Sequence, residues 1–266
     1  MKKAINAWSF ANKTPIEAMT LAKEIGYDGI ELNLEADGPT GLDSTPEDWA
    51  KIRTHSQEIG LPIHSIATGL HWGCPLTSNE ADVRKKAIAI VEKELEMAKA
   101  LGADAVLVVP GIVNDSISYD AAYDRSQAAF MQLKEKAEAL KIKIGIENVW
   151  NQFLLSPLEM RDFIDEINSP YVGVYFDIGN VLYTGLPEQW IRILGKRIYK
   201  LHFKDYRRSG AFVDLLSGDV NWPEVMVALK DIGYNGWATA EMFPYSHHPE
   251  QIVWSTLAAM KRICGR

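Results

Sequence analysis

The feature that most constrains the fold is a regular alternation of short apolar runs with amphipathic stretches along the whole chain. Between the apolar runs, residues 83–101 and 121–140 repeat apolar side chains three and four positions apart, which is typical of helices packed on one face. No linker or change of composition interrupts the alternation. It therefore predicts one parallel α/β domain over residues 1–266. The predicted strands are 4–10, 28–34, 61–67, 104–110, 143–148, 172–178, 197–203 and 236–242.

Eight strand–helix units in a chain of 266 residues favour a closed (β/α)₈ TIM barrel. The alternative is an open, doubly wound sheet. That fold usually carries a glycine-rich phosphate turn after its first strand, whereas this chain continues with ANKTP at 11–15. The barrel is the prediction that the sequence supports better.

Helix boundaries are marked by the same local signals several times. TPIE (14–17), TPED (45–48) and SPLE (156–159) each place a hydroxyl cap, a proline and then an acid, and NWPE (221–224) is a variant. Glycines in left-handed backbone are expected where helices end. These glycines are Gly26, Gly60, Gly102 and Gly233.

Charge and cysteine content limit the partners and the compartment. The net charge of −7 argues against a nucleic-acid surface, although Lys204, Arg207 and Arg208 form a local basic group that suits an anionic substrate. No apolar run approaches the ~18 residues that span a bilayer. Cys74 and Cys264 form no CxxC pair, which favours a reducing compartment. We therefore expect a cytoplasmic protein with neither nucleic-acid nor membrane partners.

Four consecutive predicted strands end with a side chain that is able to bind a metal ion. Taken singly, an acid at a strand end is often a helix cap, and a lone histidine is more often a hydrogen-bonded core residue. In a barrel, however, the carboxyl ends of all strands meet on one face. Three carboxylates there would repel one another, and a divalent cation removes that repulsion. The four residues are Glu147, Asp177, His202 and Glu241.

Three carboxylates and one imidazole form a site for a hard or borderline divalent ion. Mn²⁺ is the first expectation, and Mg²⁺, Co²⁺, Zn²⁺ and Fe²⁺ also suit such ligands. Four protein ligands leave coordination positions open, which is typical of catalytic metal sites.

The four-ligand series resembles that of the sugar phosphate isomerase/epimerase family, the ketose 3-epimerases of the xylose-isomerase-like TIM barrel superfamily. The likeness extends over nearly the whole chain and includes 26–32, 100–111 and 218–241. It implies an isomerase, either a ketose 3-epimerase or an aldose–ketose isomerase. It also implies that Glu147 and Glu241 both bind metal and act as acid and base on a sugar or sugar phosphate.

The residues themselves make this chemistry reasonable. A metal that chelates a carbonyl and the adjacent hydroxyl stabilises an enediolate, while one carboxylate removes the α-proton and the other returns it. Return on the opposite face inverts the carbon, and return to the neighbouring carbon isomerises the sugar.

The chain departs from the D-tagatose 3-epimerase pattern at two positions. Those epimerases carry a histidine three residues after the metal-binding aspartate, where this chain has Asn180, as in the pentulose-phosphate 3-epimerase branch. They also carry a second acid where this chain has Phe153. Arg208 does match a family arginine that contacts substrate oxygen. The choice between free and phosphorylated sugars stays open.

Aromatic and basic residues near the predicted strand ends are further candidates for substrate contact. Aromatic walls suit the C–H faces of a sugar, although such tryptophans often only cover a barrel mouth. Lys204 is able to neutralise an enediolate or a phosphate. The remaining candidates are His64, Trp8, Trp72 and Trp150.

Three other functions are compatible with parts of the pattern. An inosose-type dehydratase uses the same metal chemistry but releases water. An apurinic endonuclease needs several metals and a basic DNA track, which this acidic chain lacks. A sugar-binding protein without catalysis is the third, because fold does not fix function. Assembly into homodimers or homotetramers is common in the family that the chain resembles.

Overall fold

In the computed structural model, which describes residues 1–265, parallel strands close an eight-stranded barrel in the order β1-β10-β7-β6-β5-β4-β3-β2. This arrangement confirms the predicted (β/α)₈ barrel, and every predicted run overlaps one of the strands. Arg266, the last residue of the predicted domain, lies outside the described residues. The strands are β1 (Lys2–Asn6), β2 (Gly29–Asn33), β3 (Ile63–Ala67), β4 (Ala105–Val108), β5 (Lys143–Glu147), β6 (Val172–Asp177), β7 (Ile198–Phe203) and β10 (Trp237–Ala240).

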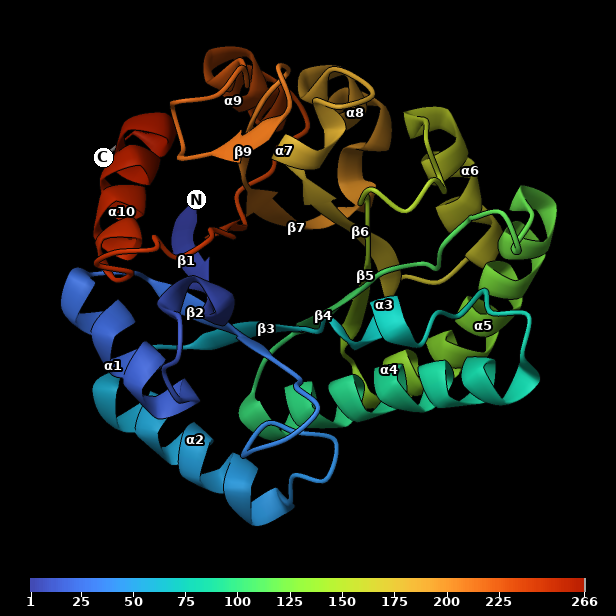
Figure 1. The fold of residues 1–266 in the computed structure, drawn as a ribbon, viewed down its shortest axis with the longest axis horizontal. Coiled ribbons are helices and arrows are strands. Elements are labelled where there is room, and N and C mark those ends of the chain that lie inside the picture. The colour runs from blue at the N-terminus through green and yellow to red at the C-terminus, as the bar shows by residue number, and fades with distance from the viewer. Residues whose placement is uncertain (266) are drawn as a thin grey trace.

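The helices form a ring around this barrel (Figure 1). The first and last long helices, α1 and α10, lie side by side where the chain closes on itself. No helix within residues 1–265 combines the length and the apolar character needed to cross a membrane. The helices are α1 (Pro15–Ile25), α2 (Pro46–Ile59), α3 (Leu70–Gly73), α4 (Ala81–Leu101), α5 (Tyr119–Leu140), α6 (Pro157–Ile167), α7 (Ile178–Val181), α8 (Pro187–Leu194), α9 (Trp222–Asp231) and α10 (Gln251–Cys264).

The predicted helix boundaries are present. Thr14 with Glu17 and Thr45 with Asp48 form reciprocal capping boxes at the starts of α1 and α2. Ser156 caps α6 by accepting from the backbone N–H of Glu159 (3.1 Å). Positive φ angles occur at Gly26, Gly60, Gly102 and Gly233.

The first strand was predicted too long. It ends at Asn6, whose side-chain Oδ1 accepts a hydrogen bond from the Trp8 backbone N–H (2.7 Å). Residues Ala7–Phe10 then form a short 3₁₀ turn, η1. The turn places Trp8 at the barrel mouth, whereas an extended strand would have carried it past the mouth.

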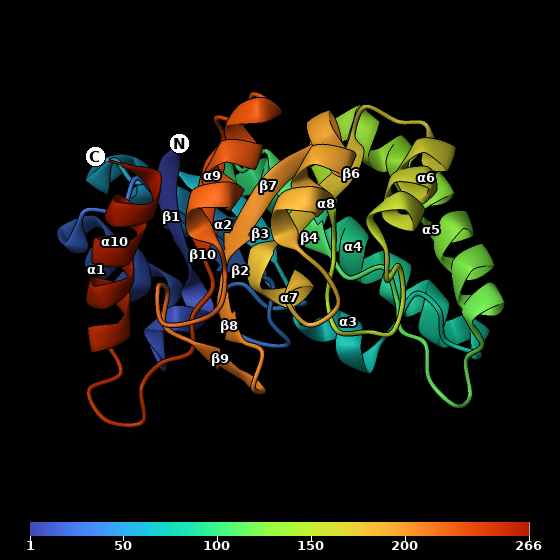
Figure 2. The ribbon, with the colours of Figure 1, turned by 90° about the horizontal axis from the view of Figure 1, so that it is seen from above.

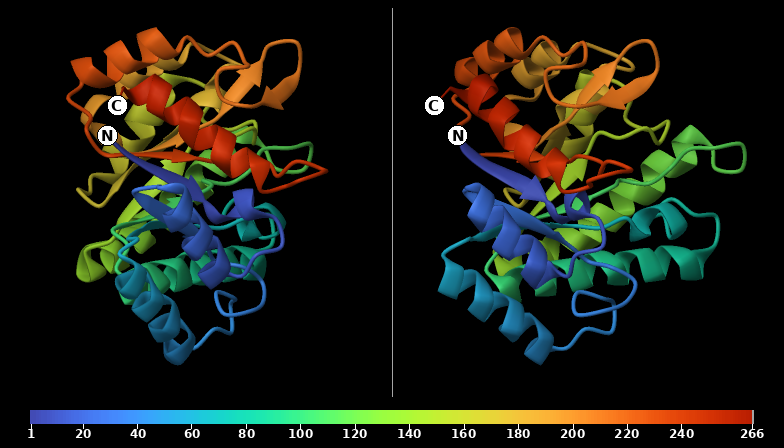
Figure 3. Two further views of the ribbon diagram at one scale, coloured as in Figure 1. Left: turned by 90° about the vertical axis from the view of Figure 1, so that its left-hand side faces the viewer. Right: turned by 60° about the vertical axis from the view of Figure 1, so that its left-hand side comes forward.

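An antiparallel hairpin of β8 (Asp205–Arg207) and β9 (Ala211–Val213), which was not predicted, follows β7. Buried Asp205 organises it by accepting from the backbone N–H groups of Tyr206 (2.9 Å), Leu216 (3.0 Å) and Val220 (3.2 Å). Figure 2 shows the hairpin at the same end of the barrel as α3 and α7, and Figure 3 shows both chain termini at the other end. The carboxyl-end face is therefore covered by irregular segments, which is where barrel enzymes build their sites.

The barrel interior is unusually polar. The strand positions 6, 31, 65, 202 and 239 are all fully buried, yet none of them is apolar. Buried polar groups need hydrogen-bond partners, so this interior has to form a connected network. That network reaches the barrel mouth through the contact between Glu31 and His202.

Candidate metal centre and active-site cleft

The four predicted ligands meet at the carboxyl end of the barrel. Glu147 and Asp177 are the last residues of β5 and β6, His202 lies near the end of β7, and Glu241 directly follows β10. One ligand atom from each lies within 4.8 Å of all the others. The closeness follows from topology, since these four strands are consecutive around the barrel.

Two ligand atoms of the group lie near charged neighbours but make no hydrogen bond within residues 1–265. His202 Nδ1 lies 3.2 Å from Glu241 Oε2 and 3.5 Å from Glu147 Oε1. Lys204 Nζ lies 2.7 Å from Glu241 Oε2 and 3.2 Å from Asp177 Oδ2. Among residues 1–265, His202 Nδ1 and Asp177 Oδ2 are nevertheless buried without a hydrogen-bond partner. A divalent ion satisfies such atoms, so the donor set fits a metal.

The electrostatics of the group separate its two glutamates. Burial raises the pKa of Glu147 to about 7, and the Glu241 charge acts in the same direction. Burial also acts to raise the pKa of Glu241, but Lys204 and His202 lower it overall. The pKa of Asp177 is raised by burial against the opposing charge of Lys204. Because divalent ions bind ionised carboxylates, a metal ion bound here would release protons.

Behind His202 lies a fully buried carboxylate, Glu31, that was not among the predicted site residues. Its Oε1 is 2.7 Å from His202 Nε2 and accepts from Asn6 Nδ2 (2.7 Å). Its Oε2 accepts from Ser65 Oγ (2.6 Å) and the Tyr175 hydroxyl (2.5 Å). Burial acts to raise its pKa, but the His202 charge and hydrogen bond lower it to about 2. A carboxylate behind a histidine fixes the ring, so that the other nitrogen faces the ligand group.

The sequence does carry a signal for Glu31. It is an acid inside a run that is otherwise apolar, between Ile30 and Leu32, and all five residues of β2 are buried. An acid in that position has to find a positive or donating partner inside the barrel. Glu31 lies two residues before the last residue of β2, so it falls outside the strand-end pattern that identified the four predicted ligands.

Above the ligand group is a cleft of about 240 Å³. Trp150 closes one wall, stacked on Phe212 with ring centroids 4.7 Å apart. Asn180 is 5% exposed and its backbone N–H donates to Asp177 Oδ1 (2.8 Å), which ties this wall to a predicted metal ligand. The predicted contact residues that line this cleft are Trp8, Trp72, Trp150, Asn180 and Lys204.

Two predicted substrate contacts do not line this cleft. His64 is the second residue of β3 and lies inside the barrel, stacked on Trp237 at 4.5 Å. The Arg208 guanidinium donates to the backbone carbonyls of Leu182 (2.9 Å) and Gly185 (3.2 Å), so it fastens the segment after α7. Both side chains serve the framework around the site.

A family model described as xylose isomerase-like TIM barrel matches residues 19–263. The chain belongs to this family. The resemblance stated from the strand-end residues is thereby confirmed at the level of the superfamily.

Individual relatives are distant. An uncharacterised protein of Methanocaldococcus jannaschii is 28% identical over 250 residues, which are 91% of this chain and 83% of that protein. An L-ribulose-5-phosphate 3-epimerase of Salmonella heidelberg is 25% identical over 237 residues, covering 86% of this chain and 82% of that enzyme. The solved structure of a D-tagatose 3-epimerase-like protein has a TM-score of 0.84 at 22% identity, covering 99% of this chain and 97% of that chain. That last likeness is one of fold.

Proposed function

We propose that the chain is a divalent-metal-dependent isomerase that epimerises or isomerises a sugar or a sugar derivative. The observation that carries this proposal is the pair Glu147 and Glu241 within one metal-ligand group. They come from β5 and β10, which are separated by β6 and β7 in the barrel, so the two carboxylates approach from different sides of the mouth. The names of the relatives, which include L-ribulose-5-phosphate 3-epimerase, support the same class of reaction.

When bound, a divalent ion supplies a Lewis acid that polarises the carbonyl and neighbouring hydroxyl oxygens of a sugar. Glu147, Asp177, His202 and Glu241 would hold it. One of the two glutamates removes the proton from the carbon next to the carbonyl, and the other delivers a proton to the opposite face. Lys204, 2.7 Å from Glu241 Oε2, favours the ionised form of that carboxylate and offers positive charge to the developing oxyanion.

The walls of the cleft present aromatic surface to a bound sugar. Trp8, Trp72 and Trp150 line the cleft together with the ligand group. Aromatic rings bind the C–H faces of sugars. Asn180, which was predicted to contact substrate, lines the same cleft.

Mn²⁺ is the ion we propose first, because three carboxylates and one imidazole suit it well; Mg²⁺, Co²⁺ and Zn²⁺ are the alternatives. A cytoplasmic location and a homo-oligomeric state remain predictions from the sequence. Within residues 1–265, the only group of three or more side chains of ligand type that lie close enough together to share a metal ion is Glu147, Asp177, His202 and Glu241. A single group is in keeping with a one-ion enzyme rather than a multi-metal nuclease.

The experiment is incubation of the Mn²⁺-loaded protein in D₂O with a panel of ketoses, ketose phosphates and keto sugars. We expect deuterium at one carbon of a product isomeric with its substrate; loss of water would indicate the dehydratase instead. Glu147→Gln and Glu241→Gln should each lower the exchange rate by about 100-fold or more, with the fold retained. Glu58→Gln, at an exposed position on α2, is the matched control.

Metal content has to be measured in the same samples, because each glutamate is also a proposed ligand. His202→Ala should lower the divalent-ion content after dialysis. Normal exchange rates in either glutamate variant would refute the assignment of acid and base.

A further inference from the structure

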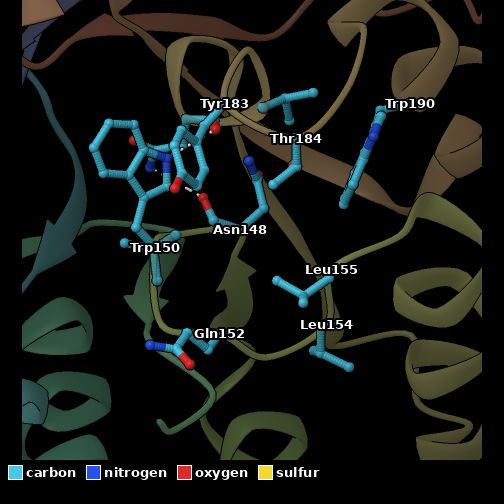
Figure 4. Close-up of a pocket in the computed structure, with 11 residues that line it drawn as sticks. Asn148, Trp150, Gln152, Leu154, Leu155, Tyr183, Thr184 and Trp190 are labelled. Atoms are coloured by element: carbon cyan, nitrogen blue, oxygen red, sulfur yellow. Dashed lines mark hydrogen bonds between the residues drawn. The ribbon is translucent and has the colours of Figure 1, made fainter. Parts of the chain in front are cut away.

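Beside the active-site cleft lies a second cavity, of about 360 Å³, which we call the side cavity (Figure 4). It is formed by the segments that follow β5 and α7. None of its lining residues carries a charge. Its walls are largely apolar and aromatic; they include Trp150, Leu154, Leu155, Tyr183, Thr184 and Trp190.

The side cavity adjoins the cleft above the ligand group. Val149, Trp150 and Asn180 line both. Asn148, which also lines the side cavity, directly follows Glu147 in the chain and exchanges hydrogen bonds with the backbone of Asp177 (2.8 and 2.9 Å). A ligand that occupies the cleft is therefore able to extend into the side cavity beside two proposed metal ligands.

The aromatic walls are held in place. Trp150 Nε1 donates to the Asn180 carbonyl (3.0 Å), which fixes the indole between the two spaces. In Figure 4, Trp190 stands on one side of the cavity, opposite Trp150 and Tyr183, and Leu155 lies along an edge. Trp190 is 5% exposed, so its ring is held by the surrounding structure. Rings on opposite sides form a slot that suits a flat apolar group.

The loop under the cavity has an unusual backbone. Gln152 (φ 57°) and Leu154 (φ 53°) both adopt the left-handed region without being glycine. The strained loop is held by the Tyr119 hydroxyl, which accepts from the Leu154 N–H (3.0 Å). Strain of this kind is retained where the surrounding structure fixes it, and such positions cluster at ligand sites.

The cations nearest to the site, Lys204, Arg207 and Arg208, do not line the side cavity. Lys204 is shared between Glu241 and Asp177. Arg207 donates to the Ser217 carbonyl (2.8 Å), and Arg208 donates to backbone carbonyls as described above. A phosphate in the side cavity would meet no charged partner, and burying an unpaired charge is strongly unfavourable.

We propose that the side cavity binds an uncharged apolar ring carried by the substrate, so that the substrate is a sugar with a free ketone and a ring substituent, such as an aryl glycoside whose sugar carries a keto group, rather than a sugar phosphate. This inference rests on the proposed function, because it assumes that the sugar itself lies at the metal-ligand group. Pockets of this volume and apolar character are typical small-molecule sites.

Two measurements on the Mn²⁺-loaded protein test the proposal. First, equilibrium dialysis with phenol should show saturable binding of one molecule per chain. Second, deuterium exchange should have a kcat/KM about tenfold or more higher for a phenyl-substituted keto sugar than for the same sugar without the ring. Thr184→Trp should weaken phenol binding and lower this ratio, because the new indole fills the cavity from an exposed loop position.

Leu158→Trp is the matched control. Leu158 is 51% exposed on α6 and does not line the cavity, so both readouts should match the wild type. If deuterium enters the sugar without the ring and the phenyl substituent does not raise kcat/KM, this inference is overturned and the proposed function stays intact. No exchange into any sugar would overturn the proposed function, and phenol binding that Thr184→Trp does not weaken would show that the cavity is not the ring site. A change of molecular mass in Thr184→Trp by light scattering would assign the cavity to a contact between copies and also overturn the proposal.

Discussion

The buried carboxyl group of Glu94 makes stability depend on pH in a way that one substitution should remove. Glu94 lies within α4 and is fully buried, and within residues 1–265 neither of its oxygens has a hydrogen-bond partner. The nearest basic atom is His71 Nε2, at 3.4 Å from Oε2. His71 Nδ1 accepts from the Val109 N–H (3.3 Å), so a neutral imidazole carries its proton on Nε2, towards Glu94.

Burial determines the protonation of both groups. It raises the pKa of Glu94 well above the usual value, with the Glu31 charge acting in the same direction. It also lowers the pKa of His71 to about 4. The fold therefore favours a protonated carboxyl beside a neutral ring. Ionising Glu94 without a partner opposes folding.

The sign and the size of the effect follow from proton linkage. Between the ordinary pKa of 4.5 and the raised pKa of the folded state, the folded chain binds a proton at Glu94 that the unfolded chain has lost. The contribution of Glu94 to stability therefore falls as pH rises through this window, by about 1.4 kcal/mol for each pH unit, and comparing the variant with the wild type isolates it from the opposite contribution of His71. Glu94→Gln keeps the shape and cannot ionise. Its free energy of unfolding should exceed that of the wild type by an amount that grows at this rate.

The assay is urea unfolding followed by circular dichroism, at pH values from about 5 to about 7 and constant salt. Glu96→Gln, at a 48% exposed side chain on the same helix, is the control, and its difference from the wild type should stay nearly constant. Parallel curves for Glu94→Gln and the wild type would refute the reasoning. They would mean that Glu94 is ionised in the fold and paired with a protonated His71.

Two further substitutions test the framework of the site. Glu31→Gln should lower the divalent-metal affinity by about 10–100-fold, because His202 loses the carboxylate that orients its ring. A titration of the variant with Mn²⁺ that matches the wild type would exclude this role of Glu31. Asp205→Asn should destabilise the chain by about 1–3 kcal/mol, because a side chain that accepts from three backbone N–H groups and from Trp222 Nε1 (3.0 Å) loses an acceptor oxygen. Hydrogen exchange should then accelerate in 205–220, and unchanged protection there would contradict the proposed role of Asp205.

The barrel was predictable because its signals are local and repeated. Strand–helix alternation, capping boxes such as that of Thr14 and Glu17, and glycines such as Gly26 each follow from short stretches of sequence. The β8–β9 hairpin was not predictable in this way. Its strands are three residues long and depend on buried Asp205, a contact that no periodicity reveals.

The proximity of the four predicted ligands could be inferred from the sequence because topology alone brings strand ends together. Glu147 and Asp177 end their strands, so closing the barrel is enough to make them neighbours. Contacts that depend on side-chain direction were harder to infer. His64 lies too early in β3 to reach the mouth, and the Arg208 guanidinium turns to carbonyl acceptors whose position follows from the loop conformation.

The position of Glu31 shows how the interior and the site depend on each other. A hydrocarbon side chain would fill the centre of the barrel without the desolvation of a fully buried carboxylate. The carboxylate is retained with donors on both oxygens, and one of them is His202 Nε2. That bond leaves Nδ1 facing Glu147 and Glu241, where it has no hydrogen-bond partner of its own among residues 1–265. A polar barrel core is therefore the physical condition for a histidine that turns its second nitrogen towards the two glutamates of the ligand group.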